Sequence, residues 1–191
     1  TAYGDCHKIL GSLNMDEWDI YSKLPPVPKG VKDVEKWILE TFKKTLDDLN
    51  LNKIKALYLH SPMQLLGKEG EKIYKTLLMM KNERKFEKIG FSVYSPTDLD
   101  LVYKKFKPDL IQLPFSIFDR RFHNSNWLKK LTNDRVEIHA RSIFLQGLIL
   151  SSSKNLPYKF SKYKPLWNEF EKWLMKNNTN AYDAALSFVF N

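Results

Sequence analysis

The chain has 191 residues, 43% of them hydrophobic and 14% aromatic, with a formal net charge of +9. This composition excludes a disordered chain and gives ample length for one core, and no run approaches the roughly 20 apolar residues that span a bilayer. The single Cys6 excludes an internal disulfide and favours a cytoplasmic protein. The lysines are dispersed among acidic residues, which favours solvated helix faces over a nucleic-acid surface.

Short apolar segments alternate along the chain with segments of helical periodicity. A helical turn over 5–10 comes first, and Val34, Ile38 and Phe42 recur at the spacing of one helix face. The predicted strands cover 18–24, 55–59, 88–92, 109–113 and 136–140. The predicted helices cover 31–50, 70–83, 95–106, 119–131, 165–176 and 181–190, and 148–163 is irregular. This alternation indicates a parallel α/β sheet with right-handed crossovers.

The spacing of the strand ends favours a barrel. Successive strand ends lie roughly 20 to 37 residues apart, and one strand–helix unit of a (β/α)8 TIM barrel averages about 31 residues. A doubly wound open sheet is the alternative, but no G-x-G-x-x-G turn follows a strand. Five strands cannot close an eight-stranded barrel. We therefore expect one domain over 1–191 that contains about strands 3–7 of an incomplete barrel.

Each predicted strand ends on polar residues. The side chains concerned are those of Lys23, His60, Ser92, Gln112 and the pair Arg141 and Ser142. Because all carboxyl ends of a parallel barrel meet at the face where such enzymes place their chemistry, these residues are predicted to line one pocket. His139 matches no motif and is interpreted as a structural or exposed residue; its position two residues before Arg141 leaves a shared face with Arg141 as the alternative.

Five motifs in the right order resemble the aldo-keto reductase superfamily. Residues 1–11 are similar to the tail of D-T-A-x-x-Y-G-x-S-E-x-x-L-G, 57–62 resembles L-x-L-H-x-P, and 88–92 resembles K-I-G-x-S. Residues 110–116 resemble the sixth-strand pattern of a glutamine followed by an aromatic residue and Asn, and 140–148 the loop after the seventh strand. Each motif is weak alone, but the set spans nearly the whole chain.

The resemblance implies an enzyme that reduces an aldehyde or ketone to an alcohol with NADPH, less often NADH, and without a metal. Tyr3 matches the proton donor, Lys23 the lysine that lowers the tyrosine pKa, and His60 the histidine that orients the carbonyl. The chemistry needs this set, because hydride attack builds negative charge on the carbonyl oxygen and a positioned acid must neutralise it. A nearby ammonium favours the phenolate and so lowers the tyrosine pKa.

The resemblance also assigns residues to the cofactor, NADP(H) more than NAD(H). Ser92 and Gln112 match positions that bind the nicotinamide carboxamide, and the loop from Ser142 to Leu148 matches the one along the pyrophosphate. The cofactor-binding candidates are Ser92, Gln112, Arg141, Ser142, Phe144, Gln146, Gly147 and Leu148. The expected substrate is a small carbonyl compound, with neither nucleic acid nor a membrane as partner.

Several positions depart from the family pattern. Arg141 replaces the aromatic residue that stacks on the nicotinamide, although a planar guanidinium can also stack. Val93 and Ser116 stand where Asn is common. The family's aspartate belongs five residues before Tyr3, ahead of Thr1. These departures motivate the alternative of a catalytically silent barrel that binds a nucleotide or a protein partner.

Overall fold

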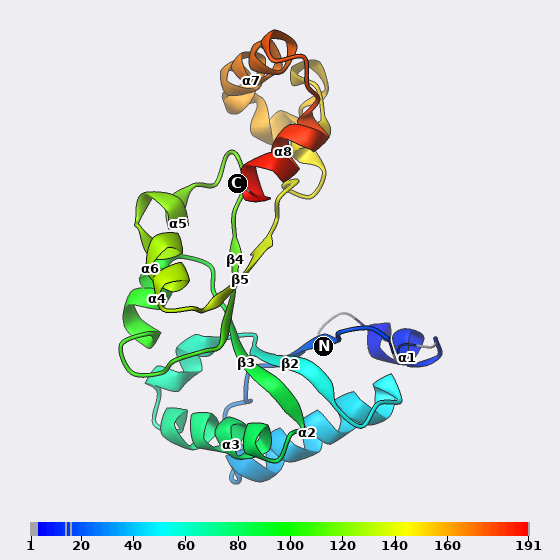
Figure 1. Ribbon diagram of the computed structural model, residues 1–191, viewed down its shortest axis with the longest axis vertical. Helices are drawn as coiled ribbons and strands as arrows, with labels where there is room; N and C mark the ends of the chain where they lie inside the picture. Colours follow the sequence, from blue (N-terminus) through cyan, green and yellow to red (C-terminus); the bar gives the residue numbers. More distant parts are fainter. Residues whose placement is uncertain (1–3, 14, 16, 191) are drawn as a thin grey trace. The chain divides into compact units, whose positions relative to one another are not determined.

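The computed structural model describes residues 4–13, 15 and 17–190, and its centre is a parallel sheet (Figure 1). The strands follow one another in the order β1-β2-β3-β4-β5. Their bounds are Tyr21–Leu24, Ile54–Leu59, Phe86–Ser92, Leu110–Pro114 and Glu137–Arg141. The predicted parallel α/β architecture is confirmed, since each of the first three pairings is parallel.

Helices connect the strands, as the periodicity predicted. In the first half of the chain they are α1 (Cys6–Gly11), α2 (Val34–Leu49), the 3-10 helix η1 (Pro62–Leu66), α3 (Gly70–Asn82) and α4 (Pro96–Val102). In the second half they are α5 (Arg121–Asn124), α6 (Trp127–Asn133), α7 (Lys164–Lys176) and α8 (Ala181–Phe190). No helix among the described residues is both long and apolar enough to cross a bilayer.

The helix that opens at Ser95 shows how local sequence sets an element's start. The Ser95 side chain accepts from the backbone N–H of Asp98, and the Asp98 carboxylate accepts from the backbone N–H of Ser95 at 2.9 Å. This capping box satisfies two N–H groups that the first helical turn leaves without a partner. Pro96 follows at the first helical position, where its missing N–H costs nothing.

The chain divides into two compact units, each described here by itself. The first unit comprises Thr1–Leu113 and Trp127–His139, and the second comprises Pro114–Asn126 and Ala140–Asn191. The expectation of a single barrel domain over 1–191 stays a prediction.

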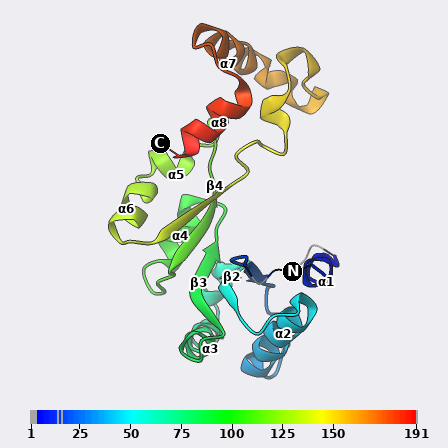
Figure 2. The same cartoon turned by 45° about the vertical axis from the view of Figure 1, so that its right-hand side comes forward.

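The core of the first unit forms where α2 and α3 cover one face of the sheet (Figure 2). The helix α2 buries a stripe that includes Ile38 and Phe42, and the Phe42 ring meets Phe86 of β3 edge-to-face with centroids 5.6 Å apart. The strand β2 is buried on both faces, as expected for a parallel strand between two layers. The helices thereby cover one face of the sheet, and we call the opposite face the concave face.

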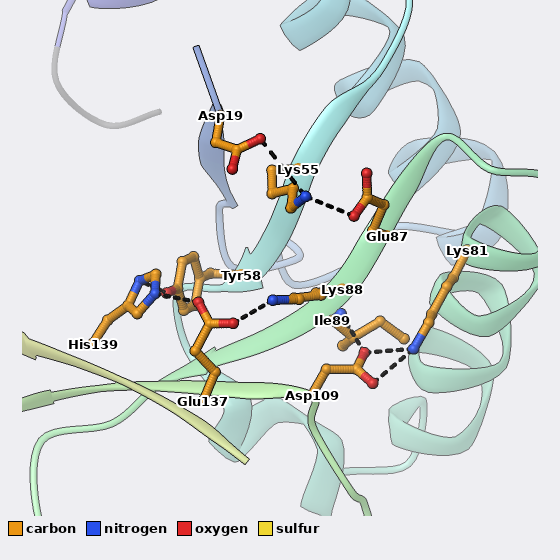
Figure 3. Close-up of polar contacts among 10 residues, drawn as sticks. All are labelled: Asp19, Lys55, Tyr58, Lys81, Glu87, Lys88, Ile89, Asp109, Glu137 and His139. Carbon is orange, nitrogen blue, oxygen red and sulfur yellow. Dashed lines mark hydrogen bonds and ion pairs between the residues drawn. The ribbon is translucent and has the colours of Figure 1, made fainter. Parts of the chain in front are cut away.

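Ion pairs fix the starts of the strands in the first unit (Figure 3). Lys55 at the start of β2 pairs with Glu87 at 2.9 Å and with Asp19 at 3.7 Å. Asp109, just before β4, accepts from the Lys81 ammonium at 2.6 and 2.7 Å and from the backbone N–H of Ile89 at 2.7 Å.

The second unit is built on aromatic packing. Its buried cluster consists of Ile149, Phe170, Ala184 and Ala185. Phe118 lies between two rings, 4.7 Å from the Trp167 centroid and 5.3 Å from that of Phe170. The segment 148–163, expected to be irregular, contains the short 3-10 helices η2 (Leu148–Leu150), η3 (Ser153–Asn155) and η4 (Tyr158–Tyr163).

One predicted helix is wrong in its continuity. We expected a single helix over 119–131, but the structure has α5 and α6 with Asn126 between them at φ = 61°. An α-helix cannot pass through a left-handed residue, and asparagine tolerates that conformation better than most other residues. The apolar periodicity of the segment therefore predicts which residues are buried but does not predict the break between the two helices.

Candidate active site at the carboxyl ends of the strands

The parallel register places four of the predicted site residues at one edge of the sheet. Lys23 of β1 is opposite Tyr58 of β2, and the backbone N–H of His60 donates to the carbonyl of Leu24 at 3.1 Å. Lys23 and His60 therefore lie at neighbouring strand ends. Their positions along the strands follow from the backbone ladder.

Ser92 and Gln112 lie at the same edge on the next two strands. They are directly opposite each other in the β3–β4 ladder, and the Ser92 hydroxyl donates to the Gln112 side-chain oxygen at 3.4 Å. Ser92 is buried and Gln112 is half-buried. The pair presents a hydroxyl and a primary amide side by side, a combination that can both accept and donate hydrogen bonds.

The predicted proton donor, Tyr3, lies outside the described residues, so its role and its distance from Lys23 stay predictions. The neighbouring helix α1 is tied to β1 by a buried hydrogen bond between His7 Nε2 and Ser22 Oγ, 3.0 Å apart. Burial lowers the pKa of His7, which favours the neutral imidazole. This contact holds the segment after Tyr3 beside the strand that carries Lys23.

Side chains on the concave face of the sheet form a polar chain that the sequence analysis did not identify (Figure 3). The Tyr58 hydroxyl lies 2.7 Å from His139 Nδ1, and His139 Nε2 lies 2.6 Å from Glu137 Oε1. The other carboxylate oxygen of Glu137 pairs with the Lys88 ammonium. We refer to Tyr58, His139, Glu137 and Lys88 as the concave-face chain.

A sequence signal for this chain did exist. Side chains on one face of a strand recur at every second residue. Tyr58 precedes His60 by two positions, and His139 stands in the same relation to Arg141. Lys88 and Glu137 lie one further step back on β3 and β5. The motif residues thus identify one face of each strand. The polar residues two and four positions earlier on the same strands could be assigned to that face from the sequence.

The second unit holds Arg141 and the predicted pyrophosphate loop. Arg141 ends β5, where its carbonyl accepts from the backbone N–H of Phe115 at 3.1 Å. The charge of Arg141 also helps to lower the pKa of Asp119, although the main cause is a two-point contact with Arg121 at 2.7 and 2.8 Å. Ser116, where the family commonly has Asn, accepts from the backbone N–H of Asp119 at 3.0 Å.

The loop after Arg141 has an unusual backbone. Ser142, Leu145 and Gln146 have φ angles of 61°, 49° and 57°, and Gly147 follows at 86°. Non-glycine residues rarely adopt this left-handed region, and clusters of them are typical of functional loops. Ser142, Gln146 and Gly147 are exposed.

Other side chains of this loop are occupied in packing. Phe144 stacks on Tyr182 of α8 with centroids 5.3 Å apart and an interplanar angle of 8°. Leu148 is half-buried at the start of η2. The loop therefore has an anchored apolar side and an exposed polar side. Among the described residues, no group of three His, Cys, Asp or Glu side chains is arranged to hold a metal ion.

Residues 9–191 match the Aldo/keto reductase family. The chain belongs to this family. Its sheet order and crossovers agree with the assignment, and the resemblance read from five motifs is confirmed. Comparison with curated protein sequences finds no match.

Solved aldo-keto reductase structures share the fold at low identity. A putative aldo-keto reductase from Pseudomonas aeruginosa is 20% identical, with 78% of this chain and 60% of that one covered and a TM-score of 0.61. The glycerol dehydrogenase from Gluconobacter oxydans is 18% identical, with 96% and 64% covered and a TM-score of 0.69. The holo form of an aldo-keto reductase from Bacillus halodurans is 20% identical, with 80% and 52% covered and a TM-score of 0.62. The chain thus spans about half to two thirds of these barrels, so the expectation of a partial TIM barrel is confirmed.

Proposed function

We propose that this protein is an NAD(P)H-dependent carbonyl reductase that converts an aldehyde or ketone to an alcohol. The observation that carries the proposal is the placement of Lys23 and His60 at neighbouring strand ends, beside the Ser92 and Gln112 pair. Family membership supplies the reaction class. The match between strand-end chemistry and family motif makes oxidoreductase activity the best-supported function.

The residues present fit a nicotinamide dinucleotide. A carboxamide offers one oxygen acceptor and one amine donor, and the Ser92 hydroxyl and the Gln112 amide can answer both. The left-handed residues of 142–147 bring backbone to the surface beside exposed polar side chains, which suits a phosphate-bearing ligand. Arg141 adds a planar cation that can lie against a ring and attract an anion.

When bound, the reduced nicotinamide supplies the hydride. His60 donates a hydrogen bond to the carbonyl oxygen and so fixes the face that is attacked. Tyr3 gives its proton to the same oxygen as negative charge develops there. Lys23 favours the phenolate that this transfer leaves behind, which lowers the pKa of Tyr3 toward neutrality. The two donors act mainly on the transition state, where the oxygen is most basic.

The proposal is tested with the full-length protein. Titration with NADPH and with NADH, followed by protein fluorescence, should give saturable binding with preference for NADPH. Turnover is then measured with a panel of small aldehydes and ketones. Tyr3→Phe should remove most carbonyl reduction and leave the nucleotide Kd nearly unchanged, because the hydroxyl acts in the chemical step. Lys23→Met should slow the same step by raising the tyrosine pKa.

Two other outcomes would change the proposal in different ways. Nucleotide binding without turnover of any carbonyl would favour the silent barrel. Wild-type turnover in Tyr3→Phe would remove that residue as the proton donor while leaving the reductase assignment standing.

A further inference from the structure

The concave-face chain joins strands that are not neighbours. Tyr58 comes from β2, His139 and Glu137 come from β5, and Lys88 comes from β3. In the sheet order, β3 and β4 separate β2 from β5. The hydrogen bond from Tyr58 to His139, at 2.7 Å, therefore crosses the concave face and bridges 81 residues of sequence (Figure 3). It fixes the separation of two strands that no backbone ladder connects directly.

The two groups that flank His139 in the chain have defined hydrogen-bonding roles. Burial raises the pKa of Tyr58, so its hydroxyl stays protonated and can donate to His139 Nδ1. The Lys88 ammonium is the main cause that lowers the pKa of Glu137, so the carboxylate accepts from His139 Nε2. The His139 ring thus lies between a hydroxyl that can donate and a carboxylate that accepts, and the ion pair with Lys88 ends the series.

The Tyr58 ring is held as firmly as its hydroxyl. The side chain is 1% exposed and packs in a cluster with Ala56 and Leu110. A Cβ atom at Gly90 would come within 2.3 Å of the ring, so the ring occupies the space that this glycine leaves open. The His139 ring is also braced, because the Tyr21 ring lies 5.0 Å from it.

Tyr58 stands between the two predicted catalytic side chains of the sheet. It is the register partner of Lys23 on β1 and precedes His60 by two residues on β2. We expect loss of the hydrogen bond between Tyr58 and His139 to be felt at the end of β2, where His60 follows Tyr58 by two residues. Misplacement of a catalytic group by an ångström can cost as much as roughly 100-fold in rate.

We propose that Tyr58, His139 and Glu137 are positioning residues for the carbonyl reduction, which hold the end of β2 so that His60 faces the substrate. The inference rests on the proposed function for its kinetic readout. It differs from that function in assigning a role to side chains that touch neither substrate nor cofactor.

The test compares two buried tyrosines in the full-length protein. Tyr58→Phe removes only the hydroxyl that reaches His139. The matched control is Tyr103→Phe, because Tyr103 is 2% exposed and its hydroxyl also bonds a titratable side chain, Asp134, at 2.7 Å. Tyr103 packs edge-to-face on Trp127 of α6, away from the concave face. Three quantities are measured in each variant: kcat, the nucleotide Kd, and the NMR signals of the His60 ring.

The expected result is a split between chemistry and binding. Tyr58→Phe should lower kcat roughly 10-fold or more, leave the nucleotide Kd within about twofold, and shift the His60 ring signals. Tyr103→Phe should change none of the three. Glu137→Gln provides a second variant in case Tyr58→Phe folds poorly. It removes the charged anchor of His139 and should lower kcat by a smaller factor with the same His60 shift.

Equal kcat and equal His60 signals in Tyr58→Phe and Tyr103→Phe would overturn the inference. The two proposals fail separately. A wild-type protein that reduces no carbonyl contradicts the proposed function, and the His60 signals alone then decide whether the concave-face chain positions that side chain.

Discussion

The two compact units position their predicted site residues by different physical means. In the first unit, Lys23, His60, Ser92 and Gln112 are placed by strand register, which a ladder of backbone hydrogen bonds enforces. In the second, the loop over 142–148 is placed by side-chain packing, with Phe144 stacked on Tyr182 and several residues at positive φ. Strand register sets where the first unit's residues lie along the sheet, whereas packing sets the shape of the loop. We therefore expect carbonyl reduction to depend mainly on the first unit, and the fit of the cofactor to depend on both.

The largest expected loss of stability comes from removing a buried aromatic ring from the core of either unit. Phe170→Ala deletes a ring buried in the cluster of the second unit, and the comparable Phe42→Ala does so in the first. Each should cost about 3–5 kcal/mol of unfolding free energy. Hydrogen exchange should show lost protection mainly in α7 and α8 for Phe170→Ala, and mainly in α2 and β3 for Phe42→Ala. Equal loss across both units in each variant would show that they unfold as one body.

A smaller effect is expected from crowding the concave face. Gly90→Ala places a Cβ atom 2.3 Å from the Tyr58 ring, so ring or strand must move. The cost should be about 1–3 kcal/mol, as for other overpacked cores. Gly67→Ala is the control, since its Cβ would lie 3.3 Å from a single carbonyl oxygen at ordinary φ. Urea unfolding measures both, and a Gly90→Ala protein as stable as Gly67→Ala would mean that the Tyr58 ring is not confined there.

Backbone strain in the loop over 142–148 can be separated from its predicted contact with the pyrophosphate by a pair of glycines. Gly147 and Gly30 have φ angles of 86° and 83°, and a Cβ atom at either would touch nothing within 4 Å. Replacing either by Ala should cost about 1–2 kcal/mol of stability, because both force an alanine into the left-handed region. Only Gly147→Ala should also weaken nucleotide binding. Equal nucleotide Kd values in the two variants would count against the loop as a cofactor contact.

The smallest expected effect is a dependence on pH. Lys88 lowers the folded-state pKa of Glu137 below its ordinary value of 4.5. The stabilisation is therefore fully present above pH 4.5 and is lost as the pH falls through the lower folded value. Glu137→Gln should flatten this acid limb in thermal unfolding measured between pH 6 and pH 3. An unchanged limb would mean that other carboxyl groups carry the acid sensitivity.

The fold was readable from the sequence because parallel strands leave two separate signals. Strand β2 appears as an apolar run, and the strand ends carry polar residues such as His60. The same periodicity located the buried side of α2. It did not detect the break at Asn126, because burial of Phe122 and Trp127 is compatible with one helix or two.

The site was readable only in part. Lys23 and Ser92 follow from the motif and the register, but the contact between Tyr58 and His139 depends on the curvature of the sheet. Curvature brings strands together that are far apart in sequence, and no local pattern encodes it. Tyr3 lies outside the described residues, so its predicted role depends on the motif alone. The positive φ angles of Leu145 and Gln146 were equally invisible, since neither residue type favours that conformation.

Asp109 has a consequence for how reliably this sheet assembles. Its backbone N–H donates to the carbonyl of Ile89, and its carboxylate accepts from the N–H of the same residue. Both groups of Asp109 therefore bind one residue of β3 immediately before β4 begins, and the Lys81 ammonium pairs with the carboxylate. A slip of one residue would break both contacts and turn Gln112 to the opposite face of the sheet. Asp109 therefore favours the observed register of β4 against β3 over a register shifted by one residue.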